Sequence, residues 1–140
     1  MIGILSADEI DRLLARQRMG RLACTADDRP YLVPINYAYD GDFLYGYGAP
    51  GRKIEVMRRQ PRVCFEVDEV DGESEWRSVV VDGLFEELTD EAPRRTALRL
   101  LNGHGPASGP VGRGLDASPR LVLFRIRMTA RSGRFERRDA

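Results

Sequence analysis

The feature that most constrains the fold is a series of strand-like runs separated by short turn signals. The first two runs, Leu22–Thr25 and Tyr31–Tyr39, flank the turn-forming stretch 27–30. The pair Asp40-Gly41 suits a two-residue hairpin turn, which would lead the chain back into a strand at Phe43–Tyr47. Because tight hairpins join antiparallel neighbours, the first half of the chain is predicted to form an antiparallel sheet.

The second half continues the same pattern. Arg62–Val70 and Trp76–Leu88 are rich in valine and phenylalanine, and Gly83 inside the second run predicts a β-bulge. Leu121–Met128 alternates apolar residues on one face. The pair Ser132-Gly133 predicts a turn into a short tail at 134–136.

Three short helices are expected among these strands. Ser6 and Glu9 have the spacing of a capping box, and Gly20 is the predicted C-terminal cap of the helix that follows. Further helices are predicted over 51–60 and from 90 to about 101. Because helices and strands do not alternate regularly, the class is mainly β with short helices, an antiparallel barrel or sheet.

Length and charge exclude several classes of function. The 140 residues fit one domain, 1–140. The 22 basic and 22 acidic side chains cancel, which gives no overall positive field for nucleic acid or an anionic membrane. No apolar run is long enough to span a bilayer, and the N-terminus lacks the features of a signal peptide. We therefore expect a cytoplasmic protein without a nucleic-acid or membrane partner.

The sequence does not favour a metal site. Cys24 and Cys64 lie in apolar strand-like runs and are interpreted as reduced core residues. The one histidine, His104, lies in a glycine- and proline-rich stretch, 103–119, which is either a functional lid or a disordered excursion. The acidic run 68–75 is interpreted as a solvated hairpin end.

A candidate phosphate site lies where the second hairpin meets the second helix. The glycine-rich stretch 46–51 leads into Arg52 and Lys53 in the first helical turn. Free amides at a helix N-terminus bind anions, whereas two cations there oppose the helix dipole. A bound phosphate would resolve this conflict, although the residues alone also fit a solvated cation pair.

The strand before this hairpin offers a surface for a flat ligand. Pro34 cannot donate a ladder hydrogen bond, which leaves the backbone around it free to face a ligand. Asn36, on the same face, can donate or accept a hydrogen bond at the edge of a heterocycle. A subunit contact or a turn would explain Asn36 equally well.

The ordered set of these segments resembles the pyridoxamine 5′-phosphate oxidase-like superfamily, and within it the flavin-nucleotide-binding branch that includes nitroimidazole-resistance proteins. The resemblance runs from about residue 6 to residue 101, and the end of the chain around Phe135 is also similar. The segments that carry it are Gly20-Arg21-Leu22-Ala23, Arg29 to Tyr37, Gly51-Arg52-Lys53, Pro61 to Val67 and Trp76 to Gly83.

The resemblance implies a Greek-key split β-barrel that forms a homodimer, with flavin mononucleotide (FMN) bound at the interface. It places Arg52 and Lys53 on the phosphate, Pro34 and Asn36 against the isoalloxazine, and Ser78 near the cofactor. Relatives often carry a hydroxyl residue or a histidine in the stretch that here reads Gly46-Tyr47-Gly48, so backbone amides are expected to substitute. The candidate cofactor-binding residues are Pro34, Asn36, Tyr45, Gly46, Tyr47, Gly48, Arg52, Lys53 and Ser78.

The predicted function is that of an FMN-dependent oxidoreductase in which the cofactor performs the chemistry. No arrangement typical of a nucleophile, an acid–base pair or a metal centre is found, and no catalytic residue is assigned. Two alternatives stay open. One is a related barrel that binds a deazaflavin, haem or pyridoxal phosphate, and the other is a flavin-binding module without turnover.

Overall fold

The structure is a computed structural model, and it describes residues 1–103 and 120–139. The predicted lid or excursion therefore lies outside the described residues except for Gly103, and so does His104. The strands are β1 (Ile2–Ile4), β2 (Met19–Ala26), β3 (Arg29–Asn36), β4 (Ala38–Tyr39), β5 (Phe43–Gly48), β6 (Arg62–Gly72), β7 (Glu75–Leu88) and β8 (Val122–Glu136). The helices are α1 (Ala7–Arg16), α2 (Arg52–Arg59) and α3 (Glu91–Asn102).

The described strands form one curled sheet. Its order is β3-β2-β6-β7-β8-β5-β4, with β1 paired to β8, and every pairing is antiparallel. The two edge strands, β3 and β4, are consecutive in the chain and are separated by Tyr37 alone. The curl therefore brings the edges toward each other without a ladder between them, and the expected mainly β, split-barrel fold is confirmed.

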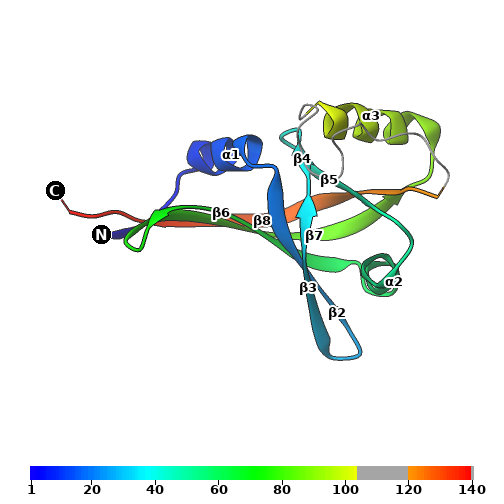
Figure 1. The fold of residues 1–140 in the computed structure, drawn as a ribbon, viewed down its shortest axis with the longest axis horizontal. Coiled ribbons are helices and arrows are strands. Elements are labelled where there is room, and N and C mark those ends of the chain that lie inside the picture. The colour runs from blue at the N-terminus through cyan, green and yellow to red at the C-terminus, as the bar shows by residue number, and fades with distance from the viewer. Residues whose placement is uncertain (104–119, 140) are drawn as a thin grey trace.

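The sheet has an inner and an outer face. Phe65, Val67, Val79 and Val81 project inward and are buried together with Leu22, Ile35 and Phe124. The side chains of α1 pack on this inner core through Ile10, Leu13 and Leu14. Figure 1 shows α1 above the long strands β6 to β8, whose other side carries no helix there.

The outer face is built from the alternate residues of the same strands. Arg21 pairs with Pro34 on β3 and Glu66 on β6, and Glu66 pairs with Val80 on β7. Side chains of directly paired residues project to the same side of a sheet. By this register the outer face also carries exposed apolar residues: Ile2, Ile4, Met19, Leu32, Val70 and Val80.

A second, smaller core lies under α3. It contains Tyr45, Leu88, Ala97, Leu101 and Leu123, so it joins α3 to β5 and to the adjoining ends of β7 and β8. In the part of the chain that the structure describes, no helix has the length and apolar character needed to cross a membrane.

Local signals in the sequence predicted several boundaries. The capping box at Ser6 and Glu9 forms, and the bulge expected at Gly83 interrupts the β7–β8 register between Asp82 and Gly83. A Cβ at Gly83 would lie 2.7 Å from the carbonyl oxygen of Arg127. Glycine therefore permits the close approach of β8 at the bulge.

Two sequence-based predictions about glycines were wrong, for one physical reason. Gly20 does not cap α1, which ends before Gln17; Gly20 lies in β2 against the ring of Phe65, where a Cβ would lie 2.2 Å from that ring. Ser132 and Gly133 do not form a turn but continue β8, and Leu5 packs against Gly133. In both places the glycine makes room for a side chain distant in sequence, which a local pattern does not reveal.

Candidate functional site

Helix α2 begins at the end of the second hairpin, and its N-terminus forms the centre of the candidate site. Its N-cap residue, Gly51, has no side chain to accept hydrogen bonds from the first amides of the helix. Ile54 and Met57 are fully buried, and Arg58 near the other end forms an ion pair with Glu87 of β7, with an Nε–Oε1 distance of 2.6 Å. The helix is therefore held at both ends while its N-terminal amides lack a side-chain partner.

Lys53 is a partly buried cation to which the described residues offer no acidic partner. Its Nζ donates to the backbone carbonyl of Tyr47 at 3.3 Å and lies 5.8 Å from the centre of the Phe124 ring. Among the described residues, no carboxylate forms an ion pair with it, and burial lowers the pKa of its ammonium group. An ammonium has three N–H donors, so the site retains donor capacity and uncompensated positive charge.

Arg52 supplies a second positive charge at the same helix terminus. The side chain is exposed, and its guanidinium lies 5.3 Å from the centre of the Tyr31 ring of β3. An arginine stacked near an aromatic ring keeps its planar fork of donors available for an oxyanion. Arg52 and Lys53 therefore present two cations at the start of one helix, with no described carboxylate paired to either.

Two glycines of β5 make room for Lys53 and for the Phe124 ring that it faces. A Cβ at Gly46 would lie 2.5 Å from the ring of Phe124, and a Cβ at Gly48 would lie 3.1 Å from Nζ of Lys53. A side chain at either position would displace the ring or the ammonium. The glycines predicted from the sequence thus set the position of Lys53.

The remaining candidates on β3 and β5 lie at the gap between the sheet edges. Asn36 donates to the hydroxyl of Tyr47 at 3.4 Å, which links the end of β3 to β5 where no ladder joins them. Pro34 is exposed on the outer face of the edge strand. Asn36, Tyr47, Gly48 and Lys53 are therefore brought together, with Arg52 beside them.

Two predicted residues do not join this group. The hydroxyl of Tyr45 donates to Asp40 at 3.0 Å, and its ring is buried in the second core under α3. Ser78 pairs with Asp68 and Arg134 on the outer face. It lies five positions along β7 from Gly83, which the ladder connects through Val63 to Cys24 near Lys53, or about 16 Å at the usual rise of a strand.

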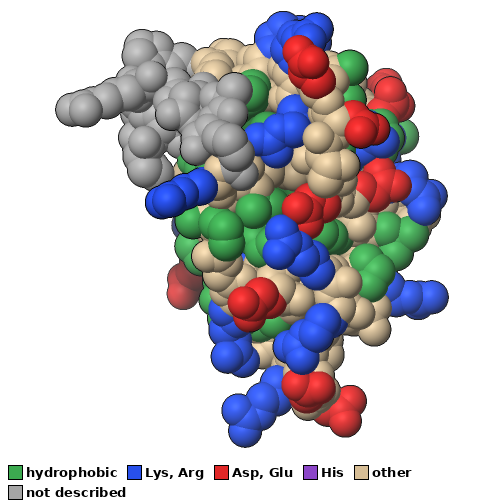
Figure 2. All heavy atoms as spheres, turned by 90° about the vertical axis from the view of Figure 1, so that its right-hand side faces the viewer, with side chains coloured by type: hydrophobic (Ala, Val, Ile, Leu, Met, Phe, Trp, Pro, Cys, Tyr) green, Lys and Arg blue, Asp and Glu red, His purple; other side chains and the backbone are tan. Residues whose placement is uncertain are grey.

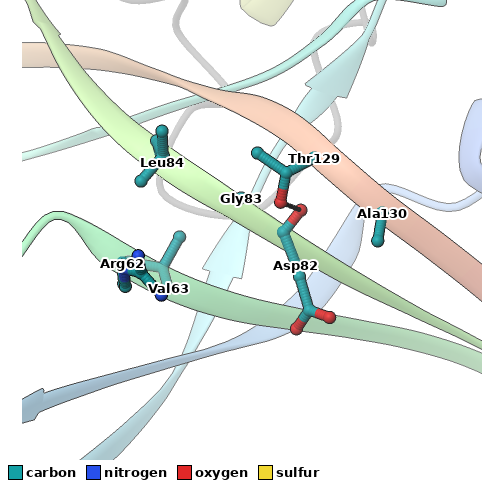
Figure 3. Close-up of a pocket in the computed structure, with 7 residues that line it drawn as sticks. All are labelled: Arg62, Val63, Asp82, Gly83, Leu84, Thr129 and Ala130. Carbon is teal, nitrogen blue, oxygen red and sulfur yellow. Dashed lines mark hydrogen bonds between the residues drawn. The ribbon is translucent and has the colours of Figure 1, made fainter.

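Two hollows lie outside this group of residues. One, of about 450 Å³, is formed at the bulge and is lined by Arg62, Asp82, Gly83 and Thr129, among others. Figure 3 shows these side chains on adjacent strands, with the Thr129 hydroxyl donating to the carbonyl of Asp82 at 3.1 Å. A second hollow, also of about 450 Å³, lies beside the loop before α2 and is lined by Pro50, Arg58, Glu87, Arg94, Arg120 and others.

The surface around α2 carries no large field of one sign. Figure 2 shows basic and acidic side chains interspersed on this side of the molecule. This agrees with the zero net charge, and it means that any attraction for an anion is local to the start of α2.

Three residues at the site were not expected from the sequence. Tyr31 lies under Arg52, Phe124 faces Lys53, and the thiol of Cys24 is close enough to Lys53 to interact with its charge. Phe124 and Cys24 reach the site only because β8 and β2 curl around the same core. Tyr31 had a weak signal, since it alternates with Pro34 and Asn36 on a strand already assigned to the site.

The chain is similar to several known proteins. A curated protein of Rhizobium meliloti, described as uncharacterized, is 41% identical over 87 residues, which are 62% of this chain and 58% of that protein. A solved structure described as a FAD-binding protein of Mesorhizobium loti is 41% identical and has a TM-score of 0.82; the match covers 98% of this chain and 99% of that one.

A more distant structure shares the fold. It is described as a putative 5-nitroimidazole antibiotic resistance protein of Bacteroides thetaiotaomicron, and it is 20% identical with a TM-score of 0.79 over 96% of this chain and 87% of its own. The model of the family described as pyridoxamine 5′-phosphate oxidase matches residues 6–135. With nearly the whole chain matched, this protein belongs to the pyridoxamine 5′-phosphate oxidase family.

Proposed function

We propose that this protein binds a flavin nucleotide, with the flavin's phosphate at the N-terminus of α2. The observation that carries the proposal is Lys53, a partly buried ammonium whose described hydrogen bond goes to a neutral carbonyl. A phosphate would supply the missing negative charge, accept from the free amides after Gly51, and take the guanidinium fork of Arg52. The FAD-binding relative from Mesorhizobium loti supports a flavin as the ligand.

We place the ring system at the gap between the sheet edges. Asn36 and Tyr47 provide polar groups beside the cations, and Pro34 offers a flat apolar surface on the edge strand. FMN, with its single phosphate, matches one site at one helix terminus. We therefore keep FMN as the proposed cofactor.

A flavin bound there would supply electron or hydride transfer, and the protein would supply binding and orientation. Lys53 and Arg52 would hold the phosphate end, and Gly48 of β5 leaves room for the ammonium of Lys53. Asn36 has an amide nitrogen to donate at the edge of the ring. We assign no proton-transferring residue, and the substrate of this proposed oxidoreductase is not specified by these contacts.

The proposed assembly is a homodimer formed through the outer face. Ile4 is 73% exposed and Leu32 is 66% exposed, and all the exposed apolar strand residues lie on this one side. The face also carries both Arg21 and Glu66, so two copies related by a twofold axis have opposite charges to offer each other. A second copy would also bring another Ser78, which a single chain holds far from its own α2.

Titration with FMN tests the phosphate site. Replacing Arg52 and Lys53 together with alanine removes two charge-assisted contacts and should weaken FMN binding by at least about a hundredfold. The matched control is Arg59→Ala, an exposed cation of the same helix, which should leave the affinity unchanged. Equal FMN affinity of the double variant and the parent would refute the phosphate site.

FAD is a second candidate ligand because of the hollow beside Pro50. Its lining includes three arginines and one glutamate, and it lies next to the loop that leads into α2. The adenylate half of FAD carries a second phosphate, and arginine is a residue type that binds phosphate. Parallel titrations decide the matter: tighter binding of FAD than of FMN, with competition by AMP against FAD alone, would replace FMN by FAD.

The absorbance spectrum of the purified protein separates the other ligand classes. Flavin bands support the proposal, whereas a Soret band or the bands of a deazaflavin or pyridoxal phosphate would replace it. Oxidation of a reduced nicotinamide with an added acceptor then distinguishes an enzyme from a binding module without turnover.

A further inference from the structure

The ring of Tyr31 lies beneath one of the two cations of the candidate phosphate site. The guanidinium carbon of Arg52 is over this ring, 5.3 Å from its centre. Arg52 itself is exposed, and no carboxylate in the described part of the chain is paired with it. The contact with Tyr31 therefore distinguishes Arg52 from a freely solvated arginine.

The register of the first hairpin explains why a ring of β3 reaches the start of α2. Tyr31 pairs with Cys24 of β2, so both side chains project to the same, inner side of the sheet. The thiol of Cys24 is close enough to Lys53 to interact with its charge. At the other end of the helix, Nη1 of Arg59 lies 3.7 Å from Oδ2 of Asp27 in the hairpin turn. The hairpin therefore contacts α2 at both ends, with Tyr31 at the end that carries the site.

An aromatic ring positions a cation differently from a carboxylate. A carboxylate would fix Arg52 by neutralising it and by occupying N–H donors that a phosphate needs. A ring attracts the guanidinium through its face and leaves the positive charge and the in-plane donors available. Lys53 has a similar environment, with its Nζ 5.8 Å from the centre of the Phe124 ring and a hydrogen bond to a neutral carbonyl. Both cations are therefore placed without being neutralised.

Holding Arg52 in place before the ligand arrives favours binding. Immobilising a free, rotamer-rich side chain on a ligand weakens binding by about two- to tenfold. Contact with the ring already restricts Arg52 in the ligand-free protein, so less freedom is lost on binding. The gain applies only to a ligand whose phosphate reaches the guanidinium, and it is absent for the same ring system without a phosphate.

We propose that Tyr31 is a positioning residue that holds Arg52 ready for the phosphate, so that the site favours FMN over unphosphorylated riboflavin. This inference deepens the proposed function and rests on it. Tyr31 acts through Arg52, and the face of its ring is the part required. Tyr31→Phe should therefore retain the effect, whereas Tyr31→Leu should lose it, because leucine is apolar but has no π face.

Titrations of the full chain with FMN and with riboflavin, followed by flavin fluorescence, test the proposal. Tyr31→Leu should lower the FMN affinity by about two- to tenfold and leave the riboflavin affinity unchanged. The matched control Tyr31→Phe should keep both affinities of the parent. In an Arg52→Ala background, Tyr31→Leu should have no further effect on FMN, because the side chain that it positions is gone.

The outcomes separate this inference from the proposed function. Equal losses of FMN and riboflavin affinity in Tyr31→Leu would mean that the ring contacts the isoalloxazine, and they would refute the inference while leaving the phosphate site standing. The same holds for an FMN loss of equal size with and without Arg52. If the joint replacement of Arg52 and Lys53 by alanine leaves FMN affinity unchanged, the phosphate site itself fails, and the inference fails with it.

A measurement on the unaltered protein does not depend on how the variants fold. Nuclear Overhauser effects between the δ protons of Arg52 and the ring protons of Tyr31 should be present in the ligand-free protein and persist with FMN bound. Their loss on addition of FMN would show that the guanidinium leaves the ring to reach its ligand, which would overturn the positioning role of Tyr31.

Discussion

The inner and outer faces of the sheet are made by alternate residues of the same strands, yet they differ in what they need. On β6, Phe65 and Val67 are fully buried beneath α1, while the alternate residues Glu66 and Asp68 lie on a face that no helix covers there (Figure 1). The inner face is completed by this chain's own helices. The outer face combines exposed apolar residues with a charged pair, which is typical of a surface that binds a partner.

This difference predicts that substitutions on the two faces have separable effects. Inner-face changes should alter the free energy of unfolding. Outer-face changes should alter association and leave the unfolding of the single chain nearly unchanged.

The largest effect is expected for Phe65→Ala. The ring is fully buried and covers Gly20. It packs edge-on against the ring of Tyr37, with 4.9 Å between the two ring centres. Its removal should cost about 3–5 kcal/mol of unfolding free energy in urea titrations. A loss below 1 kcal/mol would mean that the inner core is far more plastic than its burial indicates.

The next largest effect on the unfolding free energy is expected for Glu69, and it should depend on pH. It binds Arg16 of α1 and also Gln17 and Arg77, and the hydrogen bond from Arg16 is the main cause that lowers its pKa to about 2. Folding lowers the pKa of Glu69. Its contribution to the unfolding free energy is therefore present above pH 4.5 and is lost as pH falls toward 2.

Glu69→Gln should lower the unfolding free energy at pH 7 by about 1–2 kcal/mol, a value reduced for the partial exposure of the side chain. The variant should also lose less stability than the parent between pH 4.5 and pH 2.5. Parallel acid profiles of the two proteins would contradict the role of Glu69.

Lys53→Met should separate binding from stability. The ammonium is partly buried, and its hydrogen-bond partner is a carbonyl. An apolar side chain of similar length should therefore change the unfolding free energy of the ligand-free protein by less than about 1 kcal/mol. We expect this change to be a gain in stability. FMN affinity should fall at least about tenfold. Arg59→Met on the same helix is the control, and a variant that loses stability but keeps affinity would show that Lys53 is structural.

The smallest effect on unfolding is expected at Val80, which is 37% exposed on the outer face. Val80→Thr keeps the branched shape and should change the unfolding free energy by no more than about 0.5 kcal/mol, measured at low protein concentration. The dimer should weaken severalfold in sedimentation. An effect on unfolding as large as that of Phe65→Ala would abolish the distinction between the faces.

Much of the candidate site was predictable because its parts are adjacent in the chain. The glycine-rich end of β5, the helix start at Gly51 and the cations Arg52 and Lys53 all lie within a few residues of one another. That no carboxylate in the described part of the chain pairs with Lys53 was not predictable, since it depends on which side chains β2 and β8 bring near it.

The sequence by itself determined the features that depend on neighbours along the chain. These are the capping box at Ser6, the helix limits set by Gly51 and Pro61, the hairpins and the antiparallel class. Each depends on backbone conformations or hydrogen bonds among a few consecutive residues, so a short pattern contains the information.

Only the tertiary structure decided what requires residues far apart. It placed Gly20 and Gly133 inside strands, because Phe65 and Leu5 occupy the space where a side chain would be. It also separated Ser78 from Lys53 and set Glu66 and Asp68 opposite Arg21 and Ser78. Strand register fixes these distances, and register follows from packing of the whole sheet rather than from any local run of residues.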